Sequence, residues 1–202
     1  MSAAARWTWW LPLCLLAACA SGPSPLGPSG APVVAQVLGH PVRANGPDEV
    51  QYLILRELTD RFAAERGIGV SQAEVDAWLA RQRQVLAADP NVMSVPDSAE
   101  ERAAREHSAR AYELQRKIDG ALQRQYGGRI AVRTGGAVPV DAYRRFLEEQ
   151  AARGRFRILD AAYEREFWRA WTDDTRWHFL PAGSEVADRA FDAPAAPRNV
   201  HR

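Results

Sequence analysis

The stretch YLILRELTDRFAAERGIGVSQAEVDAWL, residues 52–79, contains the end of one helix and the beginning of the next. Its apolar residues recur at helical spacing before Gly67 and again after Ser71, so each half presents one apolar face. Gly67 ends the first helix, and Ser71-x-x-Glu74 is a capping box, in which the two side chains bind free amides at a helix N-terminus. The stretch therefore predicts two consecutive amphipathic helices.

Similar signals predict the rest of the domain. Pro47 suits the start of the first helix, Ser98-x-x-Glu101 opens a long third helix that Gly127 ends, and Asp160 caps the last one. A further helix begins near Val140, and short β-rich runs lie between the helices, at 33–38, 129–133, 156–158 and 177–180. We therefore expect a mostly helical α+β fold, a single domain over residues 33–181 with about five helices and short β-strands.

The second helix has a wide apolar face. At a helical spacing, one side of it carries Val75, Trp78, Leu79, Val85 and Leu86. A helix of a soluble domain normally turns such a face toward its neighbours.

The N-terminus reads as a signal peptide over residues 1–18, with Arg6 near its start and a short apolar run behind it. Leu16-Ala17-Ala18-Cys19 resembles the lipobox of bacterial lipoproteins. This resemblance implies that the peptide is cut before Cys19 and that the Cys19 thiol carries the lipid, which anchors the chain to a membrane. Two alternatives stay open: an ordinary secretory signal cut after Ala20, and an anchor that is not cut.

The segments that flank the domain have the composition of linkers. Residues 19–32 are rich in Gly, Ser and Pro, which predicts a flexible tether between the lipid and the domain. Residues 182–202 predict a disordered tail. By the sorting pattern of lipoproteins, Ala20 after the cysteine implies the outer membrane, so we expect a protein of the bacterial cell envelope that faces the periplasm.

Composition argues against most enzyme classes and cofactors. The formal net charge is +1, which gives no electrostatic basis for binding nucleic acid. Cys14 lies in the signal peptide and Cys19 is used by the lipid, so no thiol remains for a disulfide, a zinc site or a nucleophile. The histidines show no metal-ligand spacing, and no phosphate-binding or dinucleotide motif occurs. We expect no metal, no small-molecule cofactor and no catalytic residue.

Residues 33–82 resemble the N-terminal region of the SurA, PpiD and PrsA group of extracytoplasmic chaperones. The resemblance rests on VVAQVLGHPV, residues 33–42, on the helix that follows, and on Gly67-Ile68-Gly69-Val70-Ser71. It implies a chaperone-like role in binding unfolded or partner protein segments. Those proteins usually add a parvulin-type isomerase domain, which is not found here; His107 lies instead in a helical segment rich in Glu and Arg.

We therefore expect a lipid-anchored chaperone-like or envelope assembly factor without catalysis. Its partners would be the membrane, through the lipid, and unfolded or partner polypeptide. Two alternatives are a structural or accessory outer-membrane lipoprotein that holds one specific partner and a degenerate peptidyl-prolyl isomerase.

An aromatic run near the C-terminus is open to two interpretations. Tyr163, Phe167 and Trp171 recur every four residues, so they share one helix face, which is typical of core. Trp168, Trp177 and Phe179 are candidates for a peptide-binding cleft, because exposed aromatic rings bind apolar segments with little loss of entropy. Exposure distinguishes the two interpretations.

Overall fold

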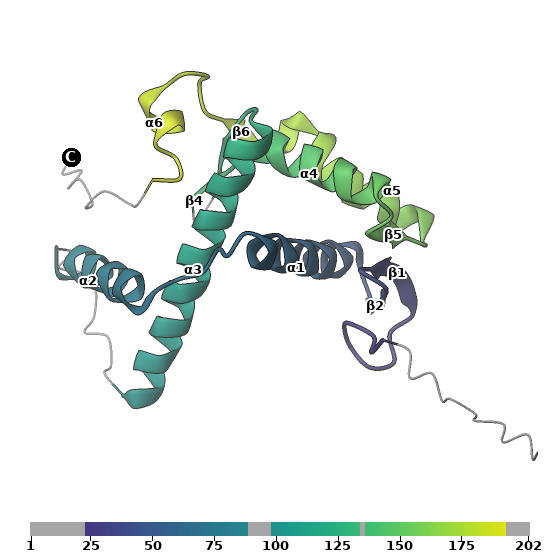
Figure 1. The fold of residues 1–202 in the computed structure, drawn as a ribbon, viewed down its shortest axis with the longest axis horizontal. Helices are drawn as coiled ribbons and strands as arrows, with labels where there is room; N and C mark the ends of the chain where they lie inside the picture. Colours follow the sequence, from purple (N-terminus) through teal and green to yellow (C-terminus); the bar gives the residue numbers. More distant parts are fainter. Residues whose placement is uncertain (1–22, 89–97, 134–135, 193–202) are drawn as a thin grey trace, which may run out of the picture.

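The computed structural model describes residues 23–88, 98–133 and 136–192 of this 202-residue chain, and the fold is mostly helical (Figure 1). Five long helices, one short helix and short antiparallel strands confirm the expected α+β class. In chain order the elements are β1 (Val33–Val37), β2 (His40–Arg43), α1 (Pro47–Glu65), α2 (Gln72–Ala88), α3 (Ala99–Tyr126), β3 (Ala131–Arg133), β4 (Gly136–Val138), α4 (Val140–Ala152), β5 (Phe156–Ile158), α5 (Ala161–Thr172), the 3₁₀ turn η1 (Asp174–Arg176), β6 (His178–Phe179) and α6 (Glu185–Asp188).

Local chemistry starts the helices where the sequence predicts. Ser71 Oγ accepts a hydrogen bond from the Glu74 amide at 3.3 Å, and the Ser71 amide donates to Glu74 Oε2 at 2.8 Å. Ser98 and Glu101 form the same capping box at the start of α3. The Asp160 carboxylate accepts from two amides of the first turn of α5. These contacts confirm all three predicted caps.

Two three-stranded sheets lie on the helices, in the orders β2-β1-β5 and β4-β3-β6. The predicted first strand is β1, but the chain then turns at Leu38 and Gly39, both with positive φ, and returns as β2. Sequence analysis missed β2 because it contains Pro41, which has no amide to donate. β5 is distant in sequence, yet it pairs with the other side of β1.

The core lies where α1, α3, α4 and α5 meet the sheets. α1 packs against β1, β2 and α5, while α4 packs between α3 and α5 (Figure 1). The Phe62 ring of α1 meets the Phe146 ring of α4 edge to face, with 5.5 Å between centroids. Tyr143 of α4 stacks on Trp171 of α5 at 5.1 Å. Such aromatic pairs add to the apolar area that these helices bury.

The predicted tether over 19–32 is wrong for the residues described, 23–32. Leu26 forms a parallel bridge with Val42, its amide donating to Pro41 O and its carbonyl accepting from the Arg43 amide, both at 2.8 Å. Ala31 is buried, and Arg43 Nη1 donates to its carbonyl at 2.6 Å. The edge of β2 thus supplies hydrogen-bond partners that composition alone does not reveal. Residues 19–22 lie outside the described ranges.

The predicted disordered tail over 182–202 is wrong for residues 182–192. This segment forms α6 and then returns to α3, where Arg116 Nη1 donates to the Phe191 carbonyl at 2.6 Å. Phe191 fits there because Gly120 has no side chain: a Cβ at Gly120 would lie 3.1 Å from the Phe191 Cβ. A contact between residues so far apart has no local sequence signal. Residues 193–202 lie outside the described ranges.

Candidate functional site

The predicted signal peptide and the predicted lipidation site, Cys19, lie outside the described residues. Their assignment stays a prediction. Across 23–88, 98–133 and 136–192, none of the helices has the length and apolar character needed to cross a membrane.

Of the aromatic residues predicted to share one face, Phe167 and Trp171 are buried and Tyr163 is half-buried. Trp168 is half-buried, with its ring centroid 5.2 Å from that of Phe167 and 6.2 Å from that of Phe156 on β5. Trp177, also half-buried, stacks on Trp171 at 6.0 Å and donates its Nε1 hydrogen to the Ala170 carbonyl at 3.2 Å. Both rings therefore extend the core.

Phe179 lies under a guanidinium group. Arg129 is 4.1 Å from the Phe179 ring centroid and hydrogen-bonds with two carboxylates, Asp141 and Asp174. These bonds lower the pKa of both carboxyls. Trp168, Trp177 and Phe179 each have a structural contact, which favours the core interpretation over the peptide-binding cleft.

A groove of about 800 Å³ lies between α2 and the N-terminal part of α3. Of the apolar face predicted for α2, only Val75 is buried; Trp78 and Leu79 are half-buried, and the last turns are open, with Leu86 36% exposed. The side chains that line the groove include Trp78, Leu79 and Leu86 of α2 and Ala104, Arg105 and Ser108 of α3. The apolar face of α2 thus forms one wall of the groove.

Polar contacts hold α2 against α3. Glu113 is only 2% exposed and binds two cations: Arg81 of α2 at 3.1 Å and Arg116 of its own helix at 2.7 Å. At the start of α2, Lys117 Nζ lies 2.6 Å from Glu74 Oε1. Lys117 and the Ser71 hydrogen bonds lower the pKa of the Glu74 carboxyl to about 2. The Arg81–Glu113 and Lys117–Glu74 ion pairs therefore join α2 to α3.

The walls of the groove are basic. Among the described residues, its lining includes three arginines, Arg83, Arg102 and Arg105, and one acidic residue, Glu106. Arg102 and Arg105 each interact with other groups, so neither is a free cation. What the described lining offers is an excess of positive over negative side chains. An apolar groove with this balance suits an apolar segment that carries acidic side chains.

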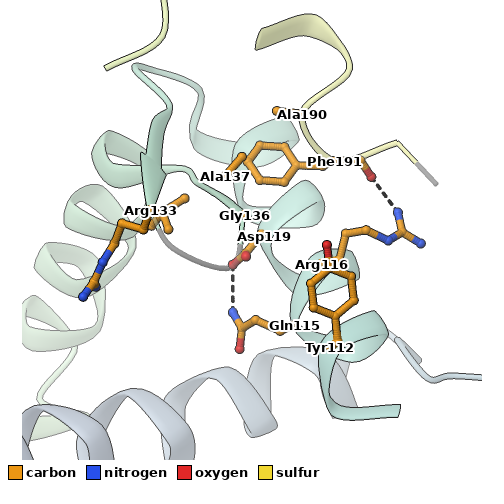
Figure 2. Close-up of a pocket in the computed structure, with 10 residues that line it drawn as sticks. Tyr112, Gln115, Arg116, Asp119, Arg133, Gly136, Ala137, Ala190 and Phe191 are labelled. Atoms are coloured by element: carbon orange, nitrogen blue, oxygen red, sulfur yellow. Dashed lines mark hydrogen bonds between the residues drawn. The ribbon is translucent and has the colours of Figure 1, made fainter. Parts of the chain in front are cut away.

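Further along α3, a second pocket of about 260 Å³ lies between that helix, β4 and the C-terminal segment (Figure 2). Asp119 lies on its wall and is 6% exposed. Asp119 Oδ1 accepts two hydrogen bonds, from Tyr143 Oη at 2.7 Å and from Gln115 Nε2 at 2.8 Å. Tyr112 and Phe191 supply aromatic walls.

Burial raises the pKa of the Asp119 carboxyl to about 6, and the hydrogen bonds from Tyr143 and Gln115 offset part of this effect. Burial and the neighbouring Asp119 charge also raise the pKa of the Tyr143 hydroxyl. A buried carboxyl that titrates near neutrality at a pocket wall marks a candidate functional site.

The residue types that bind metals do not converge in the parts of the chain that the structure describes. No group of three His, Cys, Asp or Glu side chains there has a metal-binding arrangement. His107 and His178 are exposed, and His40 Nδ1 lies 3.2 Å from the Ser24 carbonyl oxygen.

The sequence alone predicted neither the groove nor the pocket. The groove had a signal, the wide apolar face of α2, but nothing local shows that Leu86 stays uncovered. Asp119 had none, because it stands in a polar part of α3 and is buried by Tyr143 of α4 and by the C-terminal segment.

Comparison with known proteins found no matching family model, no matching curated protein and no matching solved structure.

Proposed function

We propose that this protein is a chaperone-like factor of the bacterial envelope that binds a segment of unfolded or partner polypeptide in the groove between α2 and α3, without catalysis. The observation that carries the proposal is the apolar wall of that groove, which no part of the chain that the structure describes covers. Leu86, which lines this wall, is 36% exposed, whereas a helix of a soluble domain normally exposes its polar face.

The occupant that this groove suits is an apolar polypeptide segment with acidic side chains. Trp78 supplies a broad aromatic surface, and it is held in place by the Tyr112 ring at 5.9 Å. The net positive lining then favours acidic flanks and steers their approach. Binding through a preformed wall of this kind needs little reorganisation of α2, because the Glu113 ion pairs already position it.

A lipid on Cys19 is part of the same proposal. It would hold the domain at the membrane, where segments of outer-membrane proteins arrive unfolded. Labelled palmitate should be incorporated into the full chain and not into a Cys19→Ser variant. Incorporation into both would refute the anchor and leave the groove proposal untouched.

The groove is tested with a Leu86→Ser variant of the full-length protein, purified from the envelope in mild detergent. The probe is an unfolded, fluorescently labelled outer-membrane β-barrel protein, followed by anisotropy. Removing about half of a leucine side chain's contact area should weaken binding by about tenfold, which corresponds to about 1.4 kcal/mol.

The matched control is Leu159→Ser, since Leu159 is 50% exposed between β5 and α5, away from the groove. It should bind as the unmodified protein does. Equal binding by both variants and the unmodified chain would refute the groove as the site. Binding of a folded partner but not of unfolded probe would favour the alternative of an accessory lipoprotein with one specific partner. Accelerated isomerisation of a proline peptide would favour the degenerate isomerase.

A further inference from the structure

The pocket beside Asp119 contains a buried carboxylate with one oxygen unused. Oδ1 takes both hydrogen bonds, from Tyr143 and from Gln115. Within the described residues Oδ2 has no hydrogen-bond partner, and protein atoms do not enclose it fully. Because Asp119 lines the pocket, Oδ2 is the atom open to it.

Within the described residues, no neighbouring cation neutralises this carboxylate. Among the described residues Asp119 makes no ion pair, although Arg116 and Arg133 also line the pocket. Arg116 is committed to Glu113 and to the Phe191 carbonyl. Arg133 lies over the Trp177 ring at 5.5 Å, and its guanidinium points away from Asp119 in Figure 2. A ligand could therefore supply the missing positive charge.

The remaining walls suit the stem of an organic cation. Tyr112 and Phe191 face the pocket with apolar rings, and Ala137 of β4 leaves the space beside them open. Aromatic rings attract ammonium and guanidinium groups and pack well on the methylene chains that carry them. About 260 Å³ holds one chain of the size of a lysine or arginine side chain.

We propose that this pocket binds the ammonium or guanidinium group of an organic cation, with Asp119 Oδ2 as the acceptor and Tyr112 and Phe191 against its stem. The cation could be a free amine or guanidine, or a basic side chain of a polypeptide. Among the described residues the pocket and the groove share no lining residue, although Tyr112 of the pocket contacts Trp78 of the groove, and the cation proposal does not rest on the proposed function.

The first test uses the full-length protein and calorimetric titration at pH 8 with n-butylguanidinium and n-butylammonium, and with neutral n-butylurea as the uncharged control. At least one cation should bind about tenfold or more tightly than the urea. The Asp119→Asn variant should lose that preference, while Asp60→Asn, on exposed α1 surface, should keep it. Equal affinity for cation and urea, or an unchanged preference in Asp119→Asn, would overturn the proposal.

A second variant keeps the carboxylate. Ala137→Leu should fill the pocket and abolish cation binding without touching Asp119, so the test does not depend on the folding of one variant. Undiminished binding in Ala137→Leu would also overturn the proposal.

A further arm separates the two sources of the cation. N-acetyl-lysine methylamide is compared with its norleucine counterpart. If lysine binds and norleucine does not, a polypeptide side chain can occupy the pocket. If only the small cations bind, the ligand is a free amine or guanidine.

Protonation supplies an independent readout. The titratable groups beside Asp119 are Arg116 on α3 and Arg133 on β3, which are charged, and the Tyr143 hydroxyl on α4, which is neutral over this pH range. Asp119 titrates at about 6, so cation affinity should fall as the pH is lowered from 8 to 5. A flat affinity over that range would contradict the role of Asp119.

Discussion

At the scale of single residues, Asp119 is a buried carboxyl that forms no ion pair within the described fold. Its pKa of about 6 lies above the ordinary 3.8, so the folded state holds a proton that the unfolded state loses between these values. Stability therefore falls as the pH rises through this window. Above pH 7 the cost is about 3 kcal/mol, a large share of the roughly 5–15 kcal/mol that a domain has.

Asp119→Asn should raise the free energy of unfolding by about 1–3 kcal/mol at pH 8 and have little effect near pH 4. The amide oxygen still accepts the hydrogen bonds of Tyr143 and Gln115, while the charge is gone. Urea melts at a series of pH values measure the difference. A variant less stable than the parent at pH 8 would show that the carboxylate is compensated after all.

Gly27 tests whether residues 23–32 are attached to the domain. Its φ is +95°, and a Cβ there would lie 2.0 Å from the Arg43 carbonyl oxygen. Gly30 has nearly the same φ, +92°, but an added Cβ would meet no atom within 4 Å. Both Ala variants share the cost of the left-handed backbone, about 1 kcal/mol, and only Gly27→Ala adds the clash.

Gly27→Ala should therefore be the more destabilising of the two, by roughly 1–3 kcal/mol in denaturant melts. Small, equal effects would mean that this segment is detached from β2 in solution.

At the scale of elements, α5 is held in the fold by one buried aromatic face of the helix. Phe167 and Trp171 are buried on it, while Trp168 stands at its margin. The Trp171 ring lies between Tyr143 and Trp177, but within the described residues its buried Nε1 has no hydrogen-bond partner. Ring contact, rather than hydrogen bonding, is therefore what Trp171 contributes.

Trp171→Ala should cost roughly 3–5 kcal/mol, because it leaves a cavity between two rings. Trp171→Phe should cost less, since it keeps a ring and removes an unpaired donor. Trp168→Ala should cost about 1–2 kcal/mol, as that ring is only half-buried. Melting curves of the three variants give the order. If Trp168→Ala proves neutral in stability but reduces polypeptide binding, the cleft interpretation of this ring would regain support.

At the scale of the whole molecule, α2 is joined to the rest mainly through α3 (Figure 1). Over residues 72–87, whose burial the structure describes, it contributes a single buried apolar residue, Val75, whereas α1 contributes a full face to the core. Its other contacts with α3 include the Trp78–Tyr112 ring contact and ion pairs such as Lys117 with Glu74 and Arg81 with Glu113. An element held in this way opens locally at lower free energy than the core.

Hydrogen exchange should therefore show faster exchange in α2 than in α1 and α4. Glu113→Gln, which removes the carboxylate between Arg81 and Arg116, should speed exchange in α2 further while leaving α4 unchanged. Uniform protection across α1, α2 and α4 would show that the molecule opens as one unit.

The sequence by itself determined what depends on neighbours along the chain. Ser71, Ser98 and Asp160 begin helices because their side chains reach amides two or three residues away. The spacing of Phe167 and Trp171 fixes a buried face for the same local reason. These signals were enough to predict the mostly helical α+β class and most helix boundaries.

Only the tertiary structure decided what depends on residues far apart. Leu26 is held by hydrogen bonds with Pro41 and Arg43, and Phe191 packs against Gly120. Composition alone therefore gave a wrong prediction for both flanking segments. The apolar face of α2 was visible in the sequence, but its exposure at Leu86 depends on which elements cover it. Asp119 is a candidate site because α4 and the C-terminal segment bury it. Burial is a property of the assembled chain, and charge becomes costly only where burial removes water.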